Sequence, residues 1–275
     1  MKYGANLTSV PETMLWTLHN RASEAMRSDG IINDDFAAAI YQSIEYDFEL
    51  NFGKAEPSHA VRSLDFDREI SAFLNKNPTG TVVNLGEGLE TQRFRIKNDC
   101  ALWLSVDLPE SIAIRERFIQ PDKHHLHLPY SALDNRWFEY VPSRTPVFIS
   151  AQGLFMYFTE QEVVALIKDI ASRFTDWCLM FDTIPVWLSN KSTSPKGWEK
   201  TPHYTTPKMP WGINRDHLTT YFQSQLPASL FVADVGYSNF PRGMTKWIFK
   251  ALTSLPVLRN HAPTIVKIEP VSLCK

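Results

Sequence analysis

The spacing of hydrophobic positions changes near residue 80 of this 275-residue chain. In residues 11–74, apolar side chains such as Met14, Leu18 and Ala22 recur at the spacing of one helix face. The signals that start helices in this segment are Pro11-Glu12, Asn33-Asp34 and Pro57-Ser58. From Thr81 onward, short apolar runs alternate with segments of helical spacing. This alternation predicts an α/β fold, in which a mostly parallel sheet carries helices on both faces.

Seven apolar runs in the second part of the chain are expected to be strands. They are residues 82–85, 101–106, 125–128, 146–150, 177–181, 229–235 and 264–268. Helical patterns lie between them, near residues 108–118, 159–174 and 244–252. The last two strands could include an antiparallel partner at the sheet edge. We expect residues 1–78 to form a helical cap and residues 79–275 to form the core, as one structural unit.

Residues 185–212 form a long connection rich in Pro, Ser, Thr and Lys. A connection of this length in a compact domain is usually either functional or disordered. Its aromatic residues argue against disorder; they are Trp187, Trp198, Tyr204 and Trp211. We therefore expect a lid over a substrate pocket, with a packed surface excursion as the alternative. Its position suggests that His203 and Trp211 line that pocket.

A glycine turn follows the first expected strand, in the segment Asn84-Leu85-Gly86-Glu87-Gly88. Glycine permits backbone angles closed to other residues and lets a ligand approach the main chain. Asp107 ends the next expected strand, about twenty residues further on, a spacing that suits a carboxylate bound to a ribose diol. In a parallel sheet the turn and the acid lie side by side, so a nucleoside-containing ligand is expected.

Two acids in or just after the turn bear on which nucleoside binds. The dinucleotide fingerprint needs a third glycine, and Thr91 stands there instead. Glu87 and Glu90 would repel a pyrophosphate, which needs positive potential at the helix start. S-adenosylmethionine carries a sulfonium and an ammonium and has no phosphate, so we expect it in preference to a nicotinamide cofactor. A structural turn without a ligand is the remaining alternative.

Composition is ordinary for a soluble globular protein, with 44% hydrophobic and 21% charged residues. A net charge of −2 and the lack of basic clusters argue against nucleic acid as a partner. Three distant cysteines, Cys100, Cys178 and Cys274, suggest neither a disulfide framework nor a zinc site, and the first two are expected in the core. No signal-type or membrane-length apolar run is present, so a cytoplasmic location away from membranes is expected.

Six ordered motifs give the chain a specific resemblance. They are residues 18–22 (LHNRA), 61–67 (VRSLDFD), 84–91 (NLGEGLET), 106–110 (VDLPE), 130–134 (YSALD) and 151–159 (AQGLFMYFT). With these motifs the chain resembles the leucine carboxyl methyltransferase-like family of class I S-adenosylmethionine-dependent methyltransferases. Its resemblance is greatest to the branch of the tetracenomycin-type polyketide O-methyltransferases. The resemblance implies a Rossmann-like, seven-stranded, mostly parallel sheet with an antiparallel edge strand.

The resemblance also implies roles for individual residues. Arg62 matches the arginine that binds the carboxylate of S-adenosylmethionine, and a guanidinium can hold a carboxylate bidentately. Asp107 matches the residue that accepts the ribose hydroxyls. Glu87 and Gln152 match polar neighbours of the methionine portion, although many relatives have glutamate in place of Gln152. The other positions implied to surround the cofactor are Gly86, Gly88, Leu108, Gly153 and the adenine-framing Ser131, Ala132 and Leu133.

The expected reaction is methyl transfer to oxygen of a small acid or hydroxyl compound. A carboxylate, with a pKa near about 4, is ionised and needs no base, whereas a phenol, near about 10, would benefit from one. No base is evident, which favours a carboxylate acceptor, and Tyr157 or Arg21 could bind it. The alternatives are a protein carboxyl-terminal methyltransferase, an NAD(P)-dependent oxidoreductase and a catalytically silent cofactor-binding partner protein.

Two further groups of residues have structural or metal-binding alternatives. His124-His125-Leu126-His127 could place His125 and His127 on one strand face, but no third ligand recurs at a recognisable spacing, so no metal is expected. Arg95 could form a structural ion pair with either Asp107 or Glu90. The oligomeric state is not predicted by any of these patterns.

Overall fold

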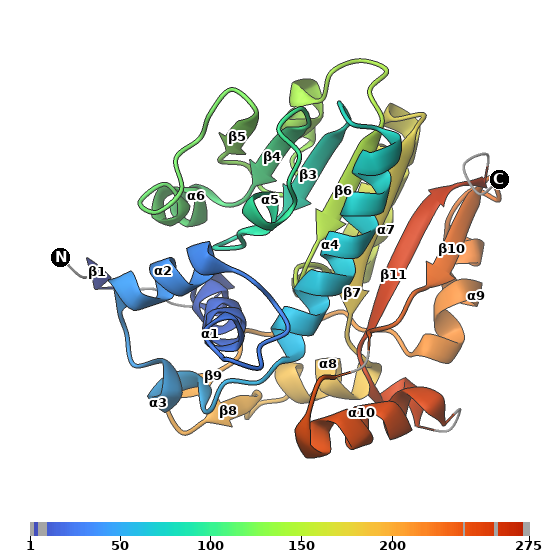
Figure 1. The fold of residues 1–275 in the computed structure, drawn as a ribbon. Helices are drawn as coiled ribbons and strands as arrows, with labels where there is room; N and C mark the ends of the chain where they lie inside the picture. The colour runs from blue at the N-terminus through green and yellow to red at the C-terminus, as the bar shows by residue number, and fades with distance from the viewer. Residues whose placement is uncertain (1–2, 5–9, 239, 256–257, 272–275) are drawn as a thin grey trace.

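A seven-stranded sheet lies at the centre of the computed structural model, which describes residues 3–4, 10–238, 240–255 and 258–271 (Figure 1). Its strands are β3 (Thr81–Leu85), β4 (Leu102–Val106), β5 (His125–Leu128), β6 (Val147–Ala151), β7 (Trp177–Thr183), β10 (Leu230–Asp234) and β11 (Thr264–Pro270). Their order across the sheet is β10-β11-β7-β6-β3-β4-β5. All seven predicted strands are therefore confirmed, and their ends differ from the prediction by two residues or fewer.

The antiparallel strand of the sheet is β11, which pairs antiparallel with both β7 and β10. It lies one position in from the edge, and β10 is the edge strand, so the predicted antiparallel pairing holds but its position differs. The helix α10 (Gly243–Ser254) lies beyond the end of β10, below the sheet in Figure 1. Because the chain re-enters the sheet from that end, β11 runs opposite to its neighbours.

The two faces of the sheet are covered by different helices. On one face, α4 (Ser58–Lys76) packs Phe66 and Ile70 against the sheet residues Val82 and Trp103. On the other face, α7 (Glu160–Arg173) and α9 (Arg215–Gln225) cover Val83 and its neighbours. Successive strand residues point to opposite faces, and because helices cover both faces, both sets of side chains in the central strands are apolar.

The helix α9 is absent from the prediction because its sequence is largely polar. Only Leu218 and Phe222 of this helix are buried, one turn apart, while most of its other side chains face solvent. Two apolar positions are too few to define a helical periodicity, although they are sufficient to anchor the helix on the sheet.

The N-terminal helices lie across the carboxyl ends of the strands (Figure 1). They are η1 (Val10–Glu12), α1 (Thr13–Ala25), α2 (Asp35–Ser43) and the unpredicted α3 (Phe48–Phe52). The Asp34 carboxylate caps α2 by accepting from the Ala37 N–H at 2.9 Å, as the sequence suggests. Leu15 and Leu18 pack in one cluster with Leu89 of the glycine turn. The predicted start at Pro57-Ser58 belongs to α4, which packs on the sheet, and the division at residue 78 stays a prediction.

The connection of residues 185–212 contains more regular structure than expected. It forms the helix α8 (Val186–Thr193) and a small hairpin of β8 (Glu199–Thr201) and β9 (Tyr204–Thr205). The Ser192 hydroxyl accepts from the Met209 N–H at 2.9 Å, and the Thr201 hydroxyl donates to the Asn51 carbonyl of α3 at 2.6 Å. The segment is therefore packed on the N-terminal helices, and whether it opens as a lid stays a prediction.

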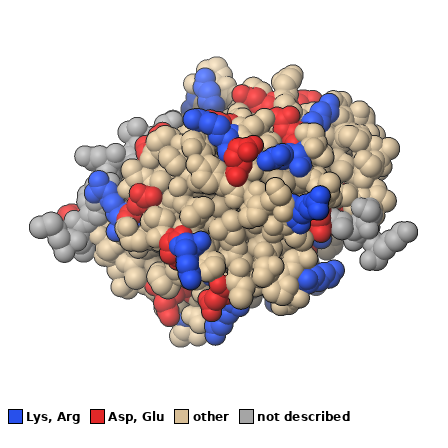
Figure 2. All heavy atoms as spheres, turned by 90° about the horizontal axis from the view of Figure 1, so that it is seen from above, with Lys and Arg blue, Asp and Glu red and all other residues tan. Residues whose placement is uncertain are grey.

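The remaining elements are short. They are β1 (Tyr3–Gly4), β2 (Ile44–Glu45), α5 (Gln92–Arg95), α6 (Pro109–Arg115), η2 (Asn135–Tyr140), η3 (Phe155–Tyr157) and η4 (Arg259–His261). Seen from above, Lys and Arg side chains lie beside Asp and Glu side chains on a mostly uncharged face (Figure 2). In the part of the chain that the structure describes, no helix has the length and apolar character needed to cross a membrane.

The cysteines differ in their surroundings. Cys178 is buried in β7, as predicted, whereas Cys100 is exposed, so its prediction as a core residue is wrong. Cys100 lies in the turn that precedes β4, where the Asn98 carboxamide oxygen accepts from its N–H at 2.9 Å. Cys274 lies outside the described residues.

Candidate active site

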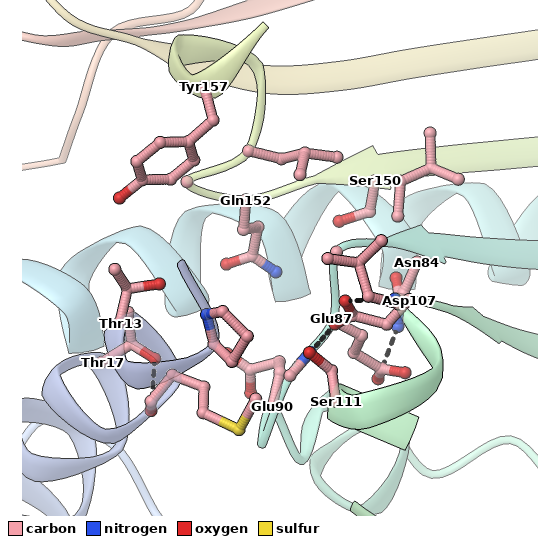
Figure 3. Close-up of a pocket in the computed structure, with 18 of the residues that line it drawn as sticks. Thr13, Thr17, Asn84, Glu87, Glu90, Asp107, Ser111, Ser150, Gln152 and Tyr157 are labelled. Carbon is pink, nitrogen blue, oxygen red and sulfur yellow. Dashed lines mark hydrogen bonds between the residues drawn. The ribbon is translucent and has the colours of Figure 1, made fainter. Parts of the chain in front are cut away.

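A cavity opens at the carboxyl ends of β3, β4 and β6, beside the helix α1, which carries Thr13 and Thr17 (Figure 3). The strand β3 pairs with β4 on one side and with β6 on the other, so the chain reverses its direction of winding here. Open α/β sheets bind ligands at such a switch point. Together with the solvent space at its mouth, the cavity contains about 720 Å³ that is not filled by protein.

The glycine turn after β3 forms the floor of this cavity. Gly86 and Gly88 adopt φ values of 63° and 53°, which favour glycine. The Asp107 carboxylate accepts from the Gly88 N–H and from the Leu108 N–H, each at 2.7 Å. Burial raises the pKa of Asp107, and the two backbone donors act against this rise. The predicted neighbourhood of turn and acid is therefore present, with Asp107 joining the ends of β3 and β4.

The two acids of the turn are each paired with arginine. Glu90 lies 3.2 Å from Arg21 and 2.7 Å from Arg95, and Glu87 lies 3.2 Å from Arg115. Although burial acts to raise it, Arg21 and Arg95 hold the pKa of Glu90 well below its usual range. The charges of Glu87 and Glu90 are thus balanced by neighbouring arginines. Their repulsion of a pyrophosphate is therefore weaker than predicted from the sequence.

Arg95 takes one of its two predicted partners and adds others. Its Nη1 lies 2.7 Å from Glu90 and 2.6 Å from Asp34, and its Nε lies 2.7 Å from Asp67. The alternative pairing with Asp107 is not formed, because the Asp107 oxygens face the backbone of the turn. Arg95 therefore connects α4 and the capping residue of α2 to the glycine turn.

Arg62 of α4 lies in the wall of the cavity. Its Nη1 donates to Asp182 Oδ2 at 3.0 Å, while the Gly153 N–H donates to Asp182 Oδ1 at 2.5 Å. The Arg62 Nε is buried and has no hydrogen-bond partner among the described residues. Asp182 is not among the site residues predicted from the sequence, although a carboxylate at the end of the apolar strand β7 is the same kind of signal as Asp107 at the end of β4.

A second cavity adjoins the first, and together with the solvent space at its mouth it contains about 1020 Å³ that is not filled by protein. The residues common to both linings are Thr13, Thr17, Arg62, Gly153 and Tyr157. Tyr157 follows β6 and points toward Thr13 of α1 (Figure 3). Burial raises the pKa of Tyr157 to about 12, so its hydroxyl stays protonated at neutral pH.

The second cavity is lined mostly by apolar and aromatic side chains. Those from the N-terminal helices, the segments after β6 and β7 and the 185–212 connection include Trp16, Met156, Ile184, Leu188, Trp198 and Met209. The 185–212 connection thus contributes to this cavity through Leu188, Trp198 and Met209, among others. His203 is exposed and Trp211 packs in the core against Phe181 and Phe222, so the expectation that these two residues line a pocket is wrong.

Other predicted site residues are placed as follows. Gln152 points into the first cavity (Figure 3). Arg21 also lines that cavity, but its nitrogens are directed to Asp34, Glu90 and the Leu89 carbonyl. The turn of Ser131, Ala132 and Leu133 follows β5 and lies outside the residues that line either cavity. Within that turn, the Ser131 hydroxyl accepts from the Leu133 N–H at 3.2 Å.

His125 of β5 has the surroundings of a structural residue. His125 is buried, its Nε2 lies 2.8 Å from the Ser105 hydroxyl oxygen, and burial together with Arg115 lowers its pKa to about 2. Among the described residues, no group of three His, Cys, Asp or Glu side chains is placed to hold a metal ion.

Comparison with known proteins gives this arrangement a context. The family model described as "Leucine carboxyl methyltransferase" matches residues 14–171, more than half of the chain. This chain belongs to the leucine carboxyl methyltransferase family. It is therefore an S-adenosylmethionine-dependent methyltransferase. The family resemblance and the enzyme class predicted from the sequence are confirmed.

Two curated relatives of this methyltransferase are informative. The tetracenomycin polyketide synthesis O-methyltransferase TcmP of Streptomyces glaucescens is 25% identical over 261 residues, which is 92% of this chain and 94% of that protein. The S-adenosyl-L-methionine-dependent methyltransferase dpfgK of Gibberella zeae is 29% identical over 188 residues, which is 62% of this chain and 63% of that protein.

Solved structures support the fold of the methyltransferase. The plantazolicin methyltransferase BamL, in complex with a triazolic desmethylPZN analog and SAH, is 11% identical with a TM-score of 0.51, over 95% of this chain and 99% of that one. A protein from Bordetella parapertussis described as a "possible exported protein" is also 11% identical, with a TM-score of 0.50 over 95% of each chain. The class I methyltransferase fold expected from the sequence is confirmed.

The polar groups of the first cavity fit S-adenosylmethionine. Three buried acceptor atoms that line it have no hydrogen-bond partner among the described residues: Asn84 Oδ1, Glu87 Oε2 and Gln152 Oε1. Unpaired buried acceptors are costly, and an ammonium group would satisfy them. The buried Nε of Arg62 would suit a carboxylate, and Asp107 retains acceptor capacity for a diol.

Proposed function

We propose that this enzyme methylates a carboxylate of a small, partly aromatic, polyketide-like metabolite. The observation that carries the proposal is the second cavity, which is largely apolar and shares its wall with the cofactor cavity. A cavity of this kind suits a small organic acceptor that lies next to the methyl donor. The name of the relative TcmP, a polyketide O-methyltransferase, supports the same acceptor class.

The shared wall supplies the polar contacts of the proposed reaction. When bound, S-adenosylmethionine supplies an electrophilic methyl group, and the protein has to align the acceptor oxygen with it and exclude water. Tyr157 is protonated and donates a hydrogen bond to the acceptor carboxylate. Arg62 binds the carboxylate of the methyl donor, and Asp107 its ribose hydroxyls.

A carboxylate acceptor agrees better than a phenol with the titratable groups of this wall. Tyr157 is held protonated by burial, and Asp182 already accepts hydrogen bonds from Arg62, the Gly153 N–H and Tyr237. Neither group is a free base, and an ionised carboxylate needs none, because its ordinary pKa of about 4 lies well below neutral pH.

The test is an assay of the purified protein with S-adenosylmethionine and a panel of aromatic acids, aliphatic acids and phenols. S-adenosylhomocysteine formation reports turnover, and mass spectrometry identifies the methylated product. Mild alkali then distinguishes the products, since a methyl ester is hydrolysed and an aryl methyl ether is not. A peptide ending in leucine serves as the arm for protein carboxyl methylation. Turnover of phenols alone, or of the peptide alone, would overturn the proposal.

A further inference from the structure

His59 lies on helix α4 and lines the second cavity, close to the wall that this cavity shares with the cofactor cavity. Its ring packs edge-on against Trp16 of α1, with ring centroids 5.4 Å apart. No sequence motif marks this histidine, and it is not among the site residues predicted from the sequence. Its place in the wall makes its hydrogen-bonding state relevant to whatever occupies the cavity.

The tautomer of His59 follows from two hydrogen bonds of Asn20. The Glu56 N–H donates to Asn20 Oδ1 at 3.1 Å, and a backbone N–H can only donate. This bond fixes the orientation of the Asn20 amide, so its Nδ2 faces His59 Nδ1 at 3.0 Å. An amide NH₂ group can only donate, so His59 Nδ1 has to be the unprotonated acceptor. In a neutral ring the proton then lies on Nε2.

The charges around His59 also favour the neutral ring. Burial lowers the pKa of His59 well below its usual value, and the positive charges of Arg62, Arg21 and Lys200 add to this effect. Glu90 acts in the opposite direction, and the Lys200 ammonium is itself paired with Glu56 at 3.0 Å. Protonation at Nδ1 would in addition place two donors against each other at Asn20.

No described residue forms a hydrogen bond with His59 Nε2. This atom is also not fully buried, so a molecule in the cavity can reach it. We propose that His59 is a neutral hydrogen-bond donor that binds an acceptor oxygen through Nε2–H, with Asn20 as the positioning residue that holds this tautomer. The acceptor then carries a hydrogen-bond-accepting oxygen, as a carboxylate or a carbonyl does. This inference rests on the proposed function for the place of the acceptor, and it excludes His59 as the general base.

The first test reads the tautomer without any acceptor. Long-range proton–nitrogen correlation spectra of ¹⁵N-histidine-labelled protein, with S-adenosylhomocysteine present, distinguish a protonated from an unprotonated ring nitrogen. We expect His59 to carry its proton on Nε2 and to stay neutral from about pH 8 down to about pH 6. Asn20→Asp should move the proton to Nδ1, because a carboxylate can only accept. A wild-type ring protonated on Nδ1, or charged at neutral pH, would overturn the proposal.

The second test uses the acid of the panel that is turned over fastest. His59→Ala should raise its KM about tenfold, the usual size of one lost hydrogen bond, and His59→Gln should recover part of this loss because its amide retains a donor. The dissociation constant of S-adenosylhomocysteine should stay within about twofold in both variants. His203→Ala is the matched control, since His203 is exposed and lies outside the cavity.

The two proposals fail in different ways. If none of the acids is a substrate, the proposed function fails, and the tautomer spectra still decide the state of His59. If acids are methylated but His59→Ala leaves their KM unchanged, the donor role is overturned while the proposed function stands. If Asn20→Asp moves the proton to Nδ1 but leaves the KM of the acid unchanged, the donor role is likewise overturned.

Discussion

Arg62 and Asp182, which are 120 residues apart in the sequence, form a buried ion pair in the wall between the two cavities, with Nη1 3.0 Å from Oδ2. Asp182 also accepts from the Gly153 N–H, so one carboxylate connects α4, β7 and the segment after β6. The pair therefore orders the wall on which the cofactor and the acceptor are proposed to meet.

Arg62 variants should separate this structural role from the proposed binding of the cofactor carboxylate. Arg62→Ala leaves Asp182 buried without its cation and should lower the free energy of unfolding by about 3–5 kcal/mol. Arg62→Lys keeps the charge but loses the bidentate geometry, so it should retain most of the stability and weaken S-adenosylhomocysteine binding about tenfold or more. Urea unfolding and calorimetry measure the two effects. Unchanged affinity in Arg62→Lys would contradict the cofactor role.

Asp107→Ala should weaken binding of S-adenosylhomocysteine by about 1–3 kcal/mol, the usual cost of removing one partner of a buried polar contact. The variant also leaves the Gly88 and Leu108 N–H groups without their acceptor, so some loss of stability should accompany it. Calorimetry below the melting temperature of the variant measures the affinity. Asp216→Ala, an exposed position on α9, is the control and should leave the affinity unchanged.

Gly153→Ala should disturb Arg62 directly. Gly153 has a φ of 66°, and a Cβ atom at this position would lie 2.8 Å from Arg62 Nη1. Gly53→Ala is the control for backbone strain, because Gly53 has a φ of 76° with a ψ of −170°, a region that favours glycine, but its added Cβ would lie no closer than 3.8 Å to another residue. Both variants should lose stability from the backbone conformation, by about 1–3 kcal/mol. Only Gly153→Ala should also weaken S-adenosylhomocysteine binding.

Tyr157→Phe should affect the acceptor more than the cofactor. Because burial raises the pKa of Tyr157 to about 12, its hydroxyl is a hydrogen-bond donor throughout the neutral range. Its loss should raise the KM of the acceptor or lower kcat by about three- to tenfold. Steady-state kinetics, together with calorimetry of S-adenosylhomocysteine binding, separate the two contributions. An equal loss of affinity for cofactor and acceptor would argue for a purely structural tyrosine.

The buried His125 should make the protein less stable in mild acid. Burial and Arg115 lower its pKa from 6.5 to about 2, so below about pH 6.5 the unfolded chain binds a proton that the folded chain does not. As the pH is lowered through this range, the free energy of unfolding should therefore decrease by up to about 1.4 kcal/mol per pH unit. His125→Gln should have a shallower slope between about pH 6 and pH 5, measured by urea unfolding. The exposed His217→Gln should retain the wild-type slope.

The sequence by itself determined the strands, the family, and the glycine turn and aspartate of the first cavity. Short apolar runs define the strands locally, and Gly86, Gly88 and Asp107 come directly after two of these runs. Neighbouring parallel strands end at the same edge of a sheet, so their turn residues meet whatever the details of packing. The polar helix α9 and the structured 185–212 segment were missed because their periodicity is weak or absent.

Only the tertiary structure decided the partners of the charged groups and the shape of the second cavity. The pairing of Arg62 with Asp182 and the contact of Asn20 with His59 join residues from different elements. Ion pairs with arginine balance the charges of Glu87 and Glu90, which makes these acids less repulsive to an anion than predicted. Sequence patterns report which face of an element is apolar, whereas a side chain's charge state and hydrogen-bond direction depend on atoms that packing brings together from distant segments.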